Sequence, residues 1–395
     1  MPKSREIPPQ REYEVVLQCG RSILQEHHMT AVQLRRVEKT FGGRKVLDGL
    51  ELEIPSGGYM VLLGPSGCGK TTTLRLIAGL ELPDSGGVEF DGCSVLAREP
   101  RHRDVSMVFQ QDGLYPHLTV QQSLVFGLER SLGKSELQSR VAQAAEIVGI
   151  ESLLSRYPDT LSGGELRRGV IAKAIVRRSS VRLLDEPLSA LDAPVRYALQ
   201  QDILRWHRTF PGTTIHVTHD GREAMRMADT IAVLDQGKIA QAGEPRGLYE
   251  RPGSLAVAKS IGTPPMNLFL ATVDRQTLTF PEARLIGRLR ANTDLEESVW
   301  VGARPEAIRI LPEKASTSDA AGISFRGIVQ DCRVVESQFH LQVALSEGSD
   351  LVNVIISSGG PNRLPHVGSE VECEVFEEDL HLFRRSDGQR IDLGN

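Results

Sequence analysis

The sequence has few of the features that mark membrane-spanning, metal-binding or nucleic-acid-binding chains. In 395 residues, no stretch approaches the roughly 20 apolar residues of a transmembrane helix, so the chain is not expected to span a membrane by itself. The five cysteines form no Cys-x-x-Cys pair, so that type of zinc site is not indicated. The net charge of −5 gives no support for broad electrostatic binding to nucleic acid or to an anionic bilayer. With 40% hydrophobic residues, the composition is that of a soluble protein of two or three domains.

The most informative segment is a glycine-rich loop that matches G-x-x-x-x-G-K-[ST]. Its members are Gly64, Pro65, Ser66, Gly67, Cys68, Gly69, Lys70 and Thr71. An apolar run at 60–63 predicts a strand before the loop, and helical spacing over 72–80 predicts a helix after it. Backbone N–H groups and the helix N-terminus would surround a phosphate chain. Lys70 would reach the β- and γ-phosphates, and the Thr71 hydroxyl would hold Mg²⁺; an ordinary glycine-rich turn is the alternative.

A second apolar run, residues 181–184, ends in two carboxylates, Asp185 and Glu186. In P-loop NTPases such a strand end supplies a carboxylate for the Mg²⁺ shell, here Asp185. Glu186 is placed to orient or deprotonate the attacking water. A surface Asp-Glu turn is the alternative. Arg182 does not suit a buried strand, and we interpret it as a side chain that snorkels to an edge.

Two further segments are weak candidates when taken alone. Ser162-Gly163-Gly164 opens a helical pattern, with Ser162 as a natural N-cap, and its bare N–H groups would suit an anion. The same residues also open ordinary helices. Phe41 lies in a glycine-rich setting and could stack on a purine, although a lone aromatic residue there is more often a packing residue.

Together, the order and spacing of these motifs resemble the ATP-binding subunits of ABC transporters. The matching segments are the P-loop, the Q-loop at 108–110 with Gln110, the signature at 161–165, the Walker B pair at 185–186, the D-loop at 189–192 and the switch at 218–220 with His219. The resemblance implies an α/β P-loop NTPase fold of the ABC type, with ATP and Mg²⁺ bound. It implies catalytic roles for Glu186, His219 and Gln110, and Mg²⁺ contacts from Thr71, Gln110 and Asp185. It implies nucleotide contacts from Phe41, all eight P-loop residues, Thr72, Ser162, Gly163, Gly164 and Asp192.

The sequence departs from the family pattern at three places. The signature ends in Glu165, where glutamine is commoner, and Lys173 stands where arginine is usual. Gly113 replaces the common alanine after the Q-loop. None of these changes removes a catalytic group, but they could alter the rate or the affinity of a dimer.

The resemblance also implies partners. Two subunits of this family enclose two ATP molecules, and the signature of one copy caps the phosphate held by Lys70 of the other. One P-loop and one signature in the chain therefore predict a homodimer. The helical segment at about 112–161 would dock on one of two transmembrane permease subunits. An extracytoplasmic solute-binding protein would deliver the solute to these permeases. The chain would be peripheral, at the cytoplasmic face of the inner (cell) membrane.

The C-terminal third has short alternating runs between turns, which predict a small β-barrel. The runs are 299–303, 308–311, 323–329, 352–356, 371–376 and 391–393. Residues 302–308 and 381–383 resemble the OB-like (TOBE-type) regulatory domain of maltose- and glycerol-3-phosphate-type ATPases. An OB-like barrel can bind oligonucleotides, but this one lacks a basic, aromatic-rich face, so we expect no nucleic-acid partner.

These observations predict three parts of the chain. Residues 1–30 would form an extension, which is either a disordered tail or a mis-assigned start before Met29. Residues 31–262 would form an ABC ATPase domain, and residues 263–395 would form the OB-like domain. The predicted function is ATP hydrolysis that energises a binding-protein-dependent importer of a carbohydrate or sn-glycerol-3-phosphate. Import of polyamine or ferric iron is an alternative within the family. A soluble ABC ATPase of DNA repair or translation is an alternative from another class.

Overall fold

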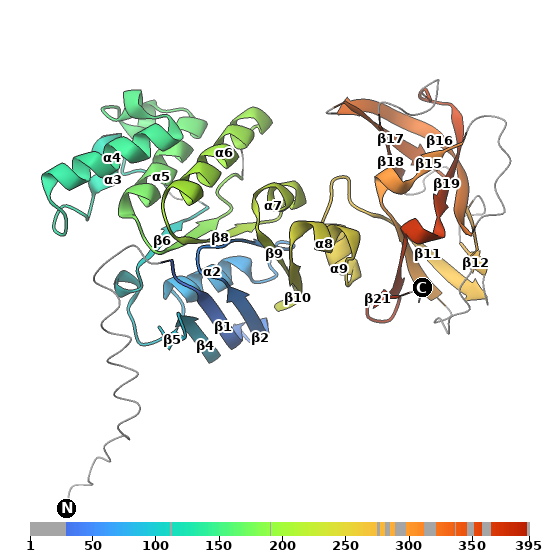
Figure 1. Cartoon of the computed structure of the whole chain (residues 1–395), viewed down its shortest axis with the longest axis horizontal. Helices are drawn as coiled ribbons and strands as arrows, with labels where there is room; N and C mark the ends of the chain where they lie inside the picture. Colours follow the sequence, from blue (N-terminus) through green and yellow to red (C-terminus); the bar gives the residue numbers. More distant parts are fainter. Residues whose placement is uncertain are drawn as a thin grey trace, which may run out of the picture. The chain divides into compact units, whose positions relative to one another are not determined.

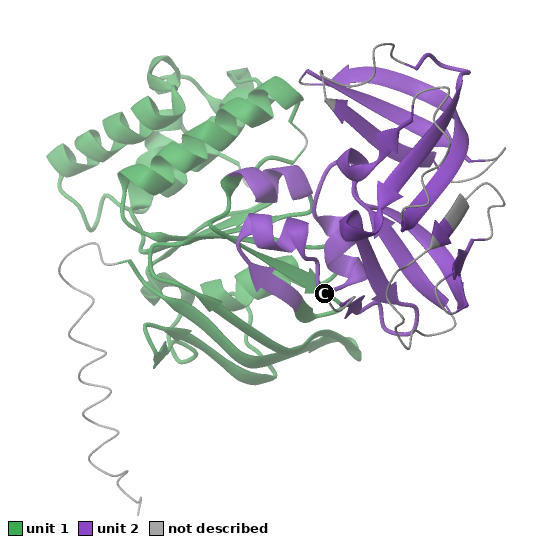
Figure 2. Cartoon of the chain, turned by 45° about the vertical axis from the view of Figure 1, so that its right-hand side comes forward, with its two compact units in different colours: residues 1–219, 227–239 green, residues 220–226, 240–395 purple. Residues whose placement is uncertain are grey.

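The computed structural model describes most of the chain after residue 28. The described residues are 29–110, 113–189, 191–274, 277–280, 285–288, 298–311, 321–335, 337–345, 351–357 and 365–392. The expectation for residues 1–28 lies outside them. Two compact units are present, one of residues 1–219 and 227–239 and one of residues 220–226 and 240–395 (Figure 2). The domain limits expected from the sequence stay predictions.

The first unit contains two sheets. A four-stranded antiparallel sheet has the order β2 (Arg44–Ile54), β1 (Val32–Phe41), β4 (Ser85–Phe90) and β5 (Cys93–Ser94). A six-stranded sheet has the order β10 (Lys238–Gly243), β9 (Thr230–Asp235), β3 (Tyr59–Leu63), β8 (Thr213–Thr218), β7 (Val181–Asp185) and β6 (Val105–Val108). Within it β3, β6, β7, β8 and β9 pair in parallel. All five residues of β3 and of β7 are buried, which suits central parallel strands.

One hydrophobic core joins the two sheets. Apolar side chains of β1, β2 and β4 pack with those of β3, β7, β8 and β9 and with the inner face of α2 (Lys70–Ala78). Leu74, Ile77 and Ala78, which share one face of this helix, are all buried. The start of α2 is therefore fixed between two packed layers.

The first unit also contains the helices α3 (Val120–Val125), α4 (Lys134–Val148), α5 (Gly163–Arg177) and α6 (Ala193–Thr209). Helix α5 contacts β6, and α3 and α4 pack against α5. Figure 1 shows α3, α4 and α5 gathered away from the four-stranded sheet. Both α3 and α4 lie within the segment at about 112–161 that the sequence predicts to be helical. None of the described helices is long and apolar enough to cross a membrane.

The interpretation of Arg182 as a snorkelling residue is wrong. Its side chain is only 1% exposed, because β7 lies between β6 and β8. Instead, Nη2 donates to the carbonyl oxygens of Phe210 (2.6 Å) and Pro211 (2.7 Å), and the guanidinium lies 4.9 Å from the Trp206 ring centroid. Burial lowers its pKa to about 10. The positive charge thus lies at the C-terminal end of α6, where the helix dipole favours it.

The second unit is mainly antiparallel sheet. Its described strands are β11 (Asn267–Asp274), β12 (Thr277–Thr279), β13 (Leu285–Arg288), β14 (Ser298–Ala303), β15 (Arg309–Ile310), β16 (Gly322–Val335), β17 (Gln338–Ala344), β18 (Leu351–Ser357), β19 (Glu370–Phe376), β20 (Leu380–Arg384) and β21 (Arg390–Ile391). They run β15-β19-β16-β13-β12-β11-β14-β20-β21, with β17 paired to β16 and to β18. The inward residues form one core that includes Phe269, Phe325 and Leu382.

Each predicted run in the C-terminal third corresponds to a strand, although Leu393 lies outside the described residues. The predicted runs did not include β11, β12, β13, β17 or β20. The unit also contains α8 (Pro245–Glu250), α9 (Leu255–Ser260) and residues 221–226 of α7 (Gly221–Met227).

Candidate functional site

The predicted site residues follow the carboxyl ends of neighbouring parallel strands. Leu63, the last residue of β3, pairs with Thr218, the last residue of β8. Asp185, the last residue of β7, pairs with Val217. Because parallel strands end at the same edge, the loops that follow them converge there, which is where open α/β sheets bind ligands.

The P-loop follows β3 and leads into α2. Lys70 is only 5% exposed, and its Nζ donates to the carbonyl oxygens of Gly64 (2.8 Å) and Pro65 (2.9 Å). Gly69 precedes α2 with φ of 114°, and a Cβ there would lie 2.6 Å from a methyl carbon of Leu47. Glycine is therefore required at this position on two counts. The rest of the loop is exposed at Pro65, Ser66 and Gly67 and buried at Gly64 and Cys68, and Thr72 follows half-buried in α2.

Burial raises the pKa of the Cys68 thiol, while the nearby Lys70 charge opposes that rise. Cys68 is therefore held as a thiol rather than a nucleophilic thiolate at neutral pH.

Thr71 and Asp185 meet across 114 residues of sequence. The Thr71 hydroxyl Oγ1 donates to Asp185 Oδ1 at 3.0 Å. Burial raises the pKa of the Asp185 carboxyl, and the hydrogen bond from Thr71 opposes that rise. The described residues contain no group of three or more His, Cys, Asp or Glu that could hold a metal ion. One hydroxyl and one carboxylate nevertheless fit Mg²⁺, which commonly takes one or two protein oxygens together with substrate phosphates.

The three predicted catalytic side chains are in contact. Glu186 Oε2 accepts a hydrogen bond from Gln110 Nε2 at 3.2 Å, and Glu186 Oε1 lies 3.2 Å from His219 Nδ1. Its backbone has φ of 45°, which is uncommon for a residue with a side chain. The Glu186 N–H donates to the Val217 carbonyl at 3.0 Å, and the Glu186 carbonyl accepts from Ser189 Oγ at 2.9 Å. Such a backbone persists only where its surroundings hold it, and Glu186 is held on both sides.

One residue of the site was missed by the sequence reasoning. Arg167 in α5 is 9% exposed, and its guanidinium donates to three backbone carbonyls. The acceptors are Phe109 (3.0 Å), Glu186 (3.2 Å) and Pro187 (2.5 Å). Arg167 shares helical spacing with Val170 and Ile171, so its place on the buried face was a usable signal. A buried guanidinium needs partners, and these are the backbones beside Gln110 and Glu186.

The signature residues form a helix N-terminus. The Ser162 N–H and hydroxyl each donate to Glu165 Oε2 at 2.8 Å, and the Glu165 N–H donates back to Ser162 Oγ at 3.4 Å. This is a capping box, and the bonds from Ser162 lower the pKa of Glu165. Glutamate in place of the commoner glutamine thus keeps the helix start intact. Ser162 and Gly163 are exposed and Gly164 is half-buried.

Some predicted residues are not joined to this cluster. Within the described ranges, no hydrogen bond links Ser162, Gly163 or Gly164 to the P-loop. Phe41, at the end of β1, is exposed, and Lys39 Nζ lies 5.0 Å from its ring centroid. Asp192 is exposed at the N-cap of α6 and makes no side-chain cap bond. The structure therefore gathers the P-loop, the carboxylates, Gln110 and His219, and leaves the other candidates outside.

Comparison with known proteins agrees with this geometry. The model of the ABC transporter family matches residues 47–189, and that of the TOBE domain matches residues 301–383. The chain is 40% identical over 365 residues to the sn-glycerol-3-phosphate import ATP-binding protein UgpC of Brucella abortus biovar 1 (strain 9-941), covering 92% of this chain and 99% of that protein. It is 39% identical over 370 residues to UgpC 3 of Rhizobium etli, covering 92% of this chain and 100% of that protein.

A solved structure supports the same assignment. CbiO1 from Clostridium perfringens, part of the ABC transporter complex cbiONQ, matches with a TM-score of 0.52 and 27% identity. The match covers 55% of this chain and 89% of that one. The predicted fold, an ABC-type P-loop domain with a C-terminal TOBE-type β domain, is confirmed. The chain is an ATPase, and it belongs to the family of ABC transporter ATP-binding proteins.

Proposed function

We propose that this chain is the subunit that hydrolyses ATP to energise import of sn-glycerol-3-phosphate or a related carbohydrate. The observation that carries the proposal is full-length similarity. Relatives named as sn-glycerol-3-phosphate import ATP-binding proteins match over 92% of the chain, including the C-terminal domain. That similarity favours this substrate class over polyamine or ferric iron, and over a soluble ATPase of DNA repair or translation.

Glu186 is proposed to act on the attacking water. In hydrolysis, water oxygen bonds to the γ-phosphorus, the bond to the bridging β–γ oxygen breaks, and the water proton needs an acceptor. Glu186, only 17% exposed in its side chain, would orient the water and take that proton. Gln110 would hold one carboxylate oxygen, and His219 would hold the other and face the γ-phosphate.

The remaining site residues would bind ATP and neutralise the charge of its phosphates. Lys70 would exchange its bonds to the Gly64 and Pro65 carbonyls for phosphate oxygens, and the P-loop N–H groups would surround the phosphates. Mg²⁺, held by Thr71 and Asp185 with Gln110 nearby, supplies positive charge to the β- and γ-phosphates when bound. Phe41 would stack on the adenine. These roles need little covalent chemistry from the protein, as is usual in phosphoryl transfer.

The working unit is proposed to be a homodimer. Ser162 and Gly163 are exposed at the start of a 15-residue helix, which favours negative charge there. In the dimer, Ser162, Gly163 and Gly164 of one copy, with Asp192 beside them, would close on the ATP that Lys70 of the other copy holds. Loss of the γ-phosphate would remove the group that bridges the copies, so the dimer would open.

An aromatic surface that includes Tyr115 and Phe126 suits the proposed permease contact. Phe126, which follows α3, is 56% exposed, and its ring centroid lies 4.5 Å from that of Tyr115. Lys173 Nζ lies 4.6 Å from the Tyr115 ring centroid. Exposed aromatic residues are enriched in protein interfaces. We infer two transmembrane permease subunits as partners, with an extracytoplasmic solute-binding protein, at the cytoplasmic face of the cell membrane.

Uptake of labelled solute tests the proposed function. In a strain from which the gene for this chain is deleted, restoring the chain should restore uptake of sn-glycerol-3-phosphate or of a sugar. A chain with Glu186→Gln should not restore it. The matched control is Glu51→Gln, an exposed glutamate on β2 whose ion pair is with Arg36. Restored uptake of polyamine or ferric iron, with no effect on sn-glycerol-3-phosphate or sugars, would overturn the proposal.

A further inference from the structure

Phe41, the candidate adenine contact, lies at the tip of a β-hairpin. It is the last residue of β1 and pairs with Arg44 of β2. Gly42 and Gly43 join the two strands at φ of 54° and 80°, the positive values that a two-residue hairpin turn requires. Phe41 is 44% exposed, so its own packing does not fix the ring. An aromatic ring at such a tip needs further contacts to keep one orientation.

Asp84 supports this tip on the side of β1 that faces away from β2. The pair of β1 with β4 nearest the tip is Glu38 with Ser85. Beyond it, the Asp84 N–H donates to the Glu38 carbonyl at 2.9 Å. Asp84 Oδ2 accepts from the Thr40 N–H at 2.7 Å. The carboxylate therefore takes the place of a strand carbonyl and continues the ladder to the residue before Phe41.

Lys39 fixes the ring itself. Its Nζ lies over the Phe41 ring, and its side chain is only 12% exposed. The same Nζ donates to the Leu82 carbonyl at 2.7 Å and lies 3.6 Å from carboxylate oxygens of Glu81 and Asp84. Three acceptors from one segment thus hold the ammonium against the ring. A cation on one face attracts electron density from the ring, so the other face suits an electron-rich planar base.

We propose that Asp84 and Lys39 are positioning residues that hold the Phe41 ring against the adenine of ATP. The inference rests on the proposed stacking of Phe41 on adenine. Helix α2, which is packed between two layers, begins with Lys70 and leads at its other end into the segment that carries Asp84. One rigid element therefore connects the phosphate contact to the support of the base contact. Asp84 and Lys39 thus act on the affinity for the base, and Lys70 acts on the affinity for the phosphates.

Calorimetry on the full-length chain separates the base contact from the phosphate contact. The probes are ATP and inorganic tripolyphosphate, each with Mg²⁺, because the second has no base. Asp84→Ala should weaken ATP binding by about threefold to tenfold, the range expected for one lost aromatic stack, and leave tripolyphosphate binding unchanged. Asp84→Asn keeps an oxygen that accepts from the Thr40 N–H, so it should restore most of the ATP affinity. Equal losses in the two variants would overturn the role of the bond to Thr40.

Asp91→Ala is the matched control, at the opposite end of the same strand. Asp91 Oδ1 accepts from the Ala31 N–H at 2.8 Å, and the Asp91 N–H donates to the Ala31 carbonyl at 2.9 Å. Asp91→Ala and Asp84→Ala each remove one bond from a side chain to the backbone at an end of β1, so both should lower the melting temperature. Only Asp84→Ala should change the ratio of the ATP and tripolyphosphate affinities. An equal change of that ratio in Asp91→Ala would overturn the positioning role.

Lys39→Met tests the contact with the ring. Methionine keeps an unbranched apolar side chain but removes the ammonium and its three contacts with the segment after α2. ATP binding should weaken, and tripolyphosphate binding should stay at the level of the parent. An equal loss for both probes would mean that the ammonium acts on the phosphates, and that result would overturn the role of Lys39 at the ring.

A double-mutant cycle decides whether Asp84 acts through Phe41. Phe41→Ala should weaken ATP binding and leave tripolyphosphate binding unchanged, and adding Asp84→Ala should cause no further loss. Additive losses, or full ATP affinity in Asp84→Ala, would overturn this inference while the adenine contact stands. Full ATP affinity in Phe41→Ala would instead overturn the proposed adenine contact, and this inference with it.

Discussion

At the scale of single residues, Glu186 is held in one orientation by its neighbours. Its carboxylate contacts Gln110 and His219, while its backbone, at φ of 45°, is bonded to Val217 and Ser189. Each of these contacts spans a different distance along the chain. Several elements thus place the carboxylate at once, and the proposed role of Glu186 as proton acceptor needs such placement relative to the water.

Glu186→Gln should lower the steady-state rate of phosphate release by about 10²- to 10⁴-fold, because an amide does not accept the water proton. The amide keeps similar size and hydrogen bonds, so ATP affinity, measured by equilibrium binding, should stay within a few-fold. Glu51→Gln removes a charge of the same sign from an exposed side chain of the same unit and should retain the full rate. Full activity in Glu186→Gln would mean that another group acts as the base.

Asp185→Asn should separate stability from activity. Burial raises the pKa of Asp185 above its usual 3.8, so the folded state binds this proton more tightly than the unfolded state. The ionised carboxylate therefore destabilises the fold at neutral pH, and this cost disappears as the pH falls through the raised pKa. The asparagine variant should melt at a higher temperature than the parent at pH 7, with the gap shrinking as the pH is lowered towards 4. Its ATPase activity should be lost. A lower melting temperature at pH 7 would contradict this account.

At the scale of elements, α5 connects the signature to the carboxylates of the same chain. Its first residue follows Ser162, and Arg167, one turn on, contacts the backbones of Phe109, Glu186 and Pro187. A shift of α5 therefore acts on the segments that carry Gln110 and Glu186. We propose that closure at the signature in the dimer reaches Glu186 through this helix.

Arg167→Lys should damage this connection. A single ammonium does not reproduce a planar guanidinium fork, so at least one buried carbonyl loses its donor. We expect the free energy of unfolding to fall by about 1–3 kcal/mol. We expect kcat to fall more than ATP affinity, because Glu186 is displaced while the P-loop is untouched. Arg177→Lys, on the exposed part of the same helix, is the matched control. Unfolding midpoints and kinetics should match the parent in the control, and a parent-like kcat in Arg167→Lys would refute the positioning role.

At the scale of the whole molecule, each chain carries one P-loop and one signature, with no hydrogen bond between them in the described part of the chain. Glu186→Gln with ATP should therefore give particles of twice the 43.4 kDa chain mass by light scattering. Adding Ser162→Asp places a negative charge against the γ-phosphate, so it should abolish that dimer while each chain still binds ATP. Adding Ser139→Asp instead, on the exposed side of α4, should leave the dimer intact. A dimer that survives Ser162→Asp would place the interface elsewhere.

The sequence by itself determined the local features of this protein. Each local feature depends on a few neighbouring positions. Examples are glycines at positive φ, Ser162 three residues before Glu165, and apolar runs that end in charged residues. The P-loop, the capping box and most strands could therefore be predicted. Their order along the chain was enough to identify the family, since each motif has its own short pattern.

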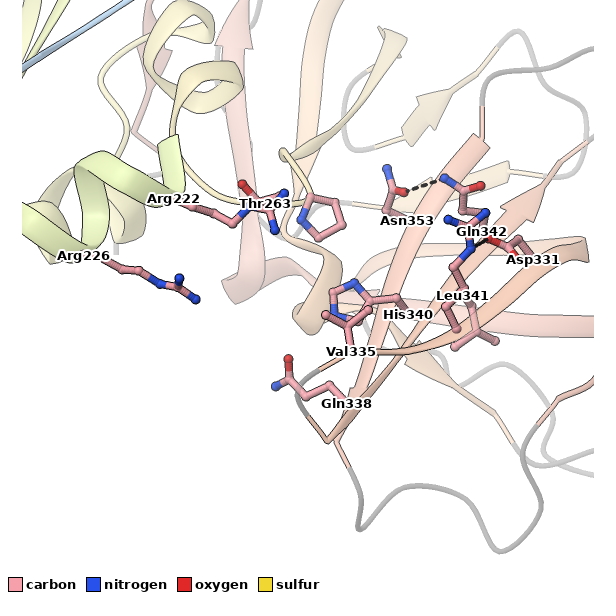
Figure 3. Close-up of a pocket in the computed structure, with 12 residues that line it drawn as sticks. Arg222, Arg226, Thr263, Asp331, Val335, Gln338, His340, Leu341, Gln342 and Asn353 are labelled. Atoms are coloured by element: carbon pink, nitrogen blue, oxygen red, sulfur yellow. Dashed lines mark hydrogen bonds and ion pairs between the residues drawn. The ribbon is translucent and has the colours of Figure 1, made fainter. Parts of the chain in front are cut away.

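The tertiary structure decided which distant segments meet. Periodicity shows which side of a strand is buried but not which strand lies beside it. The strand order β9-β3-β8-β7-β6 therefore could not be predicted from the sequence. That order brings Gln110 and His219 to Glu186 and turns Arg182 inward onto the end of α6. The packing of α5 brings Arg167 to the backbone of Glu186. In the second unit, packing alone brings the arginines of α7 to a pocket that residues of β17 and β18 also line (Figure 3). These contacts depend on long-range packing, whose energetics no local pattern contains.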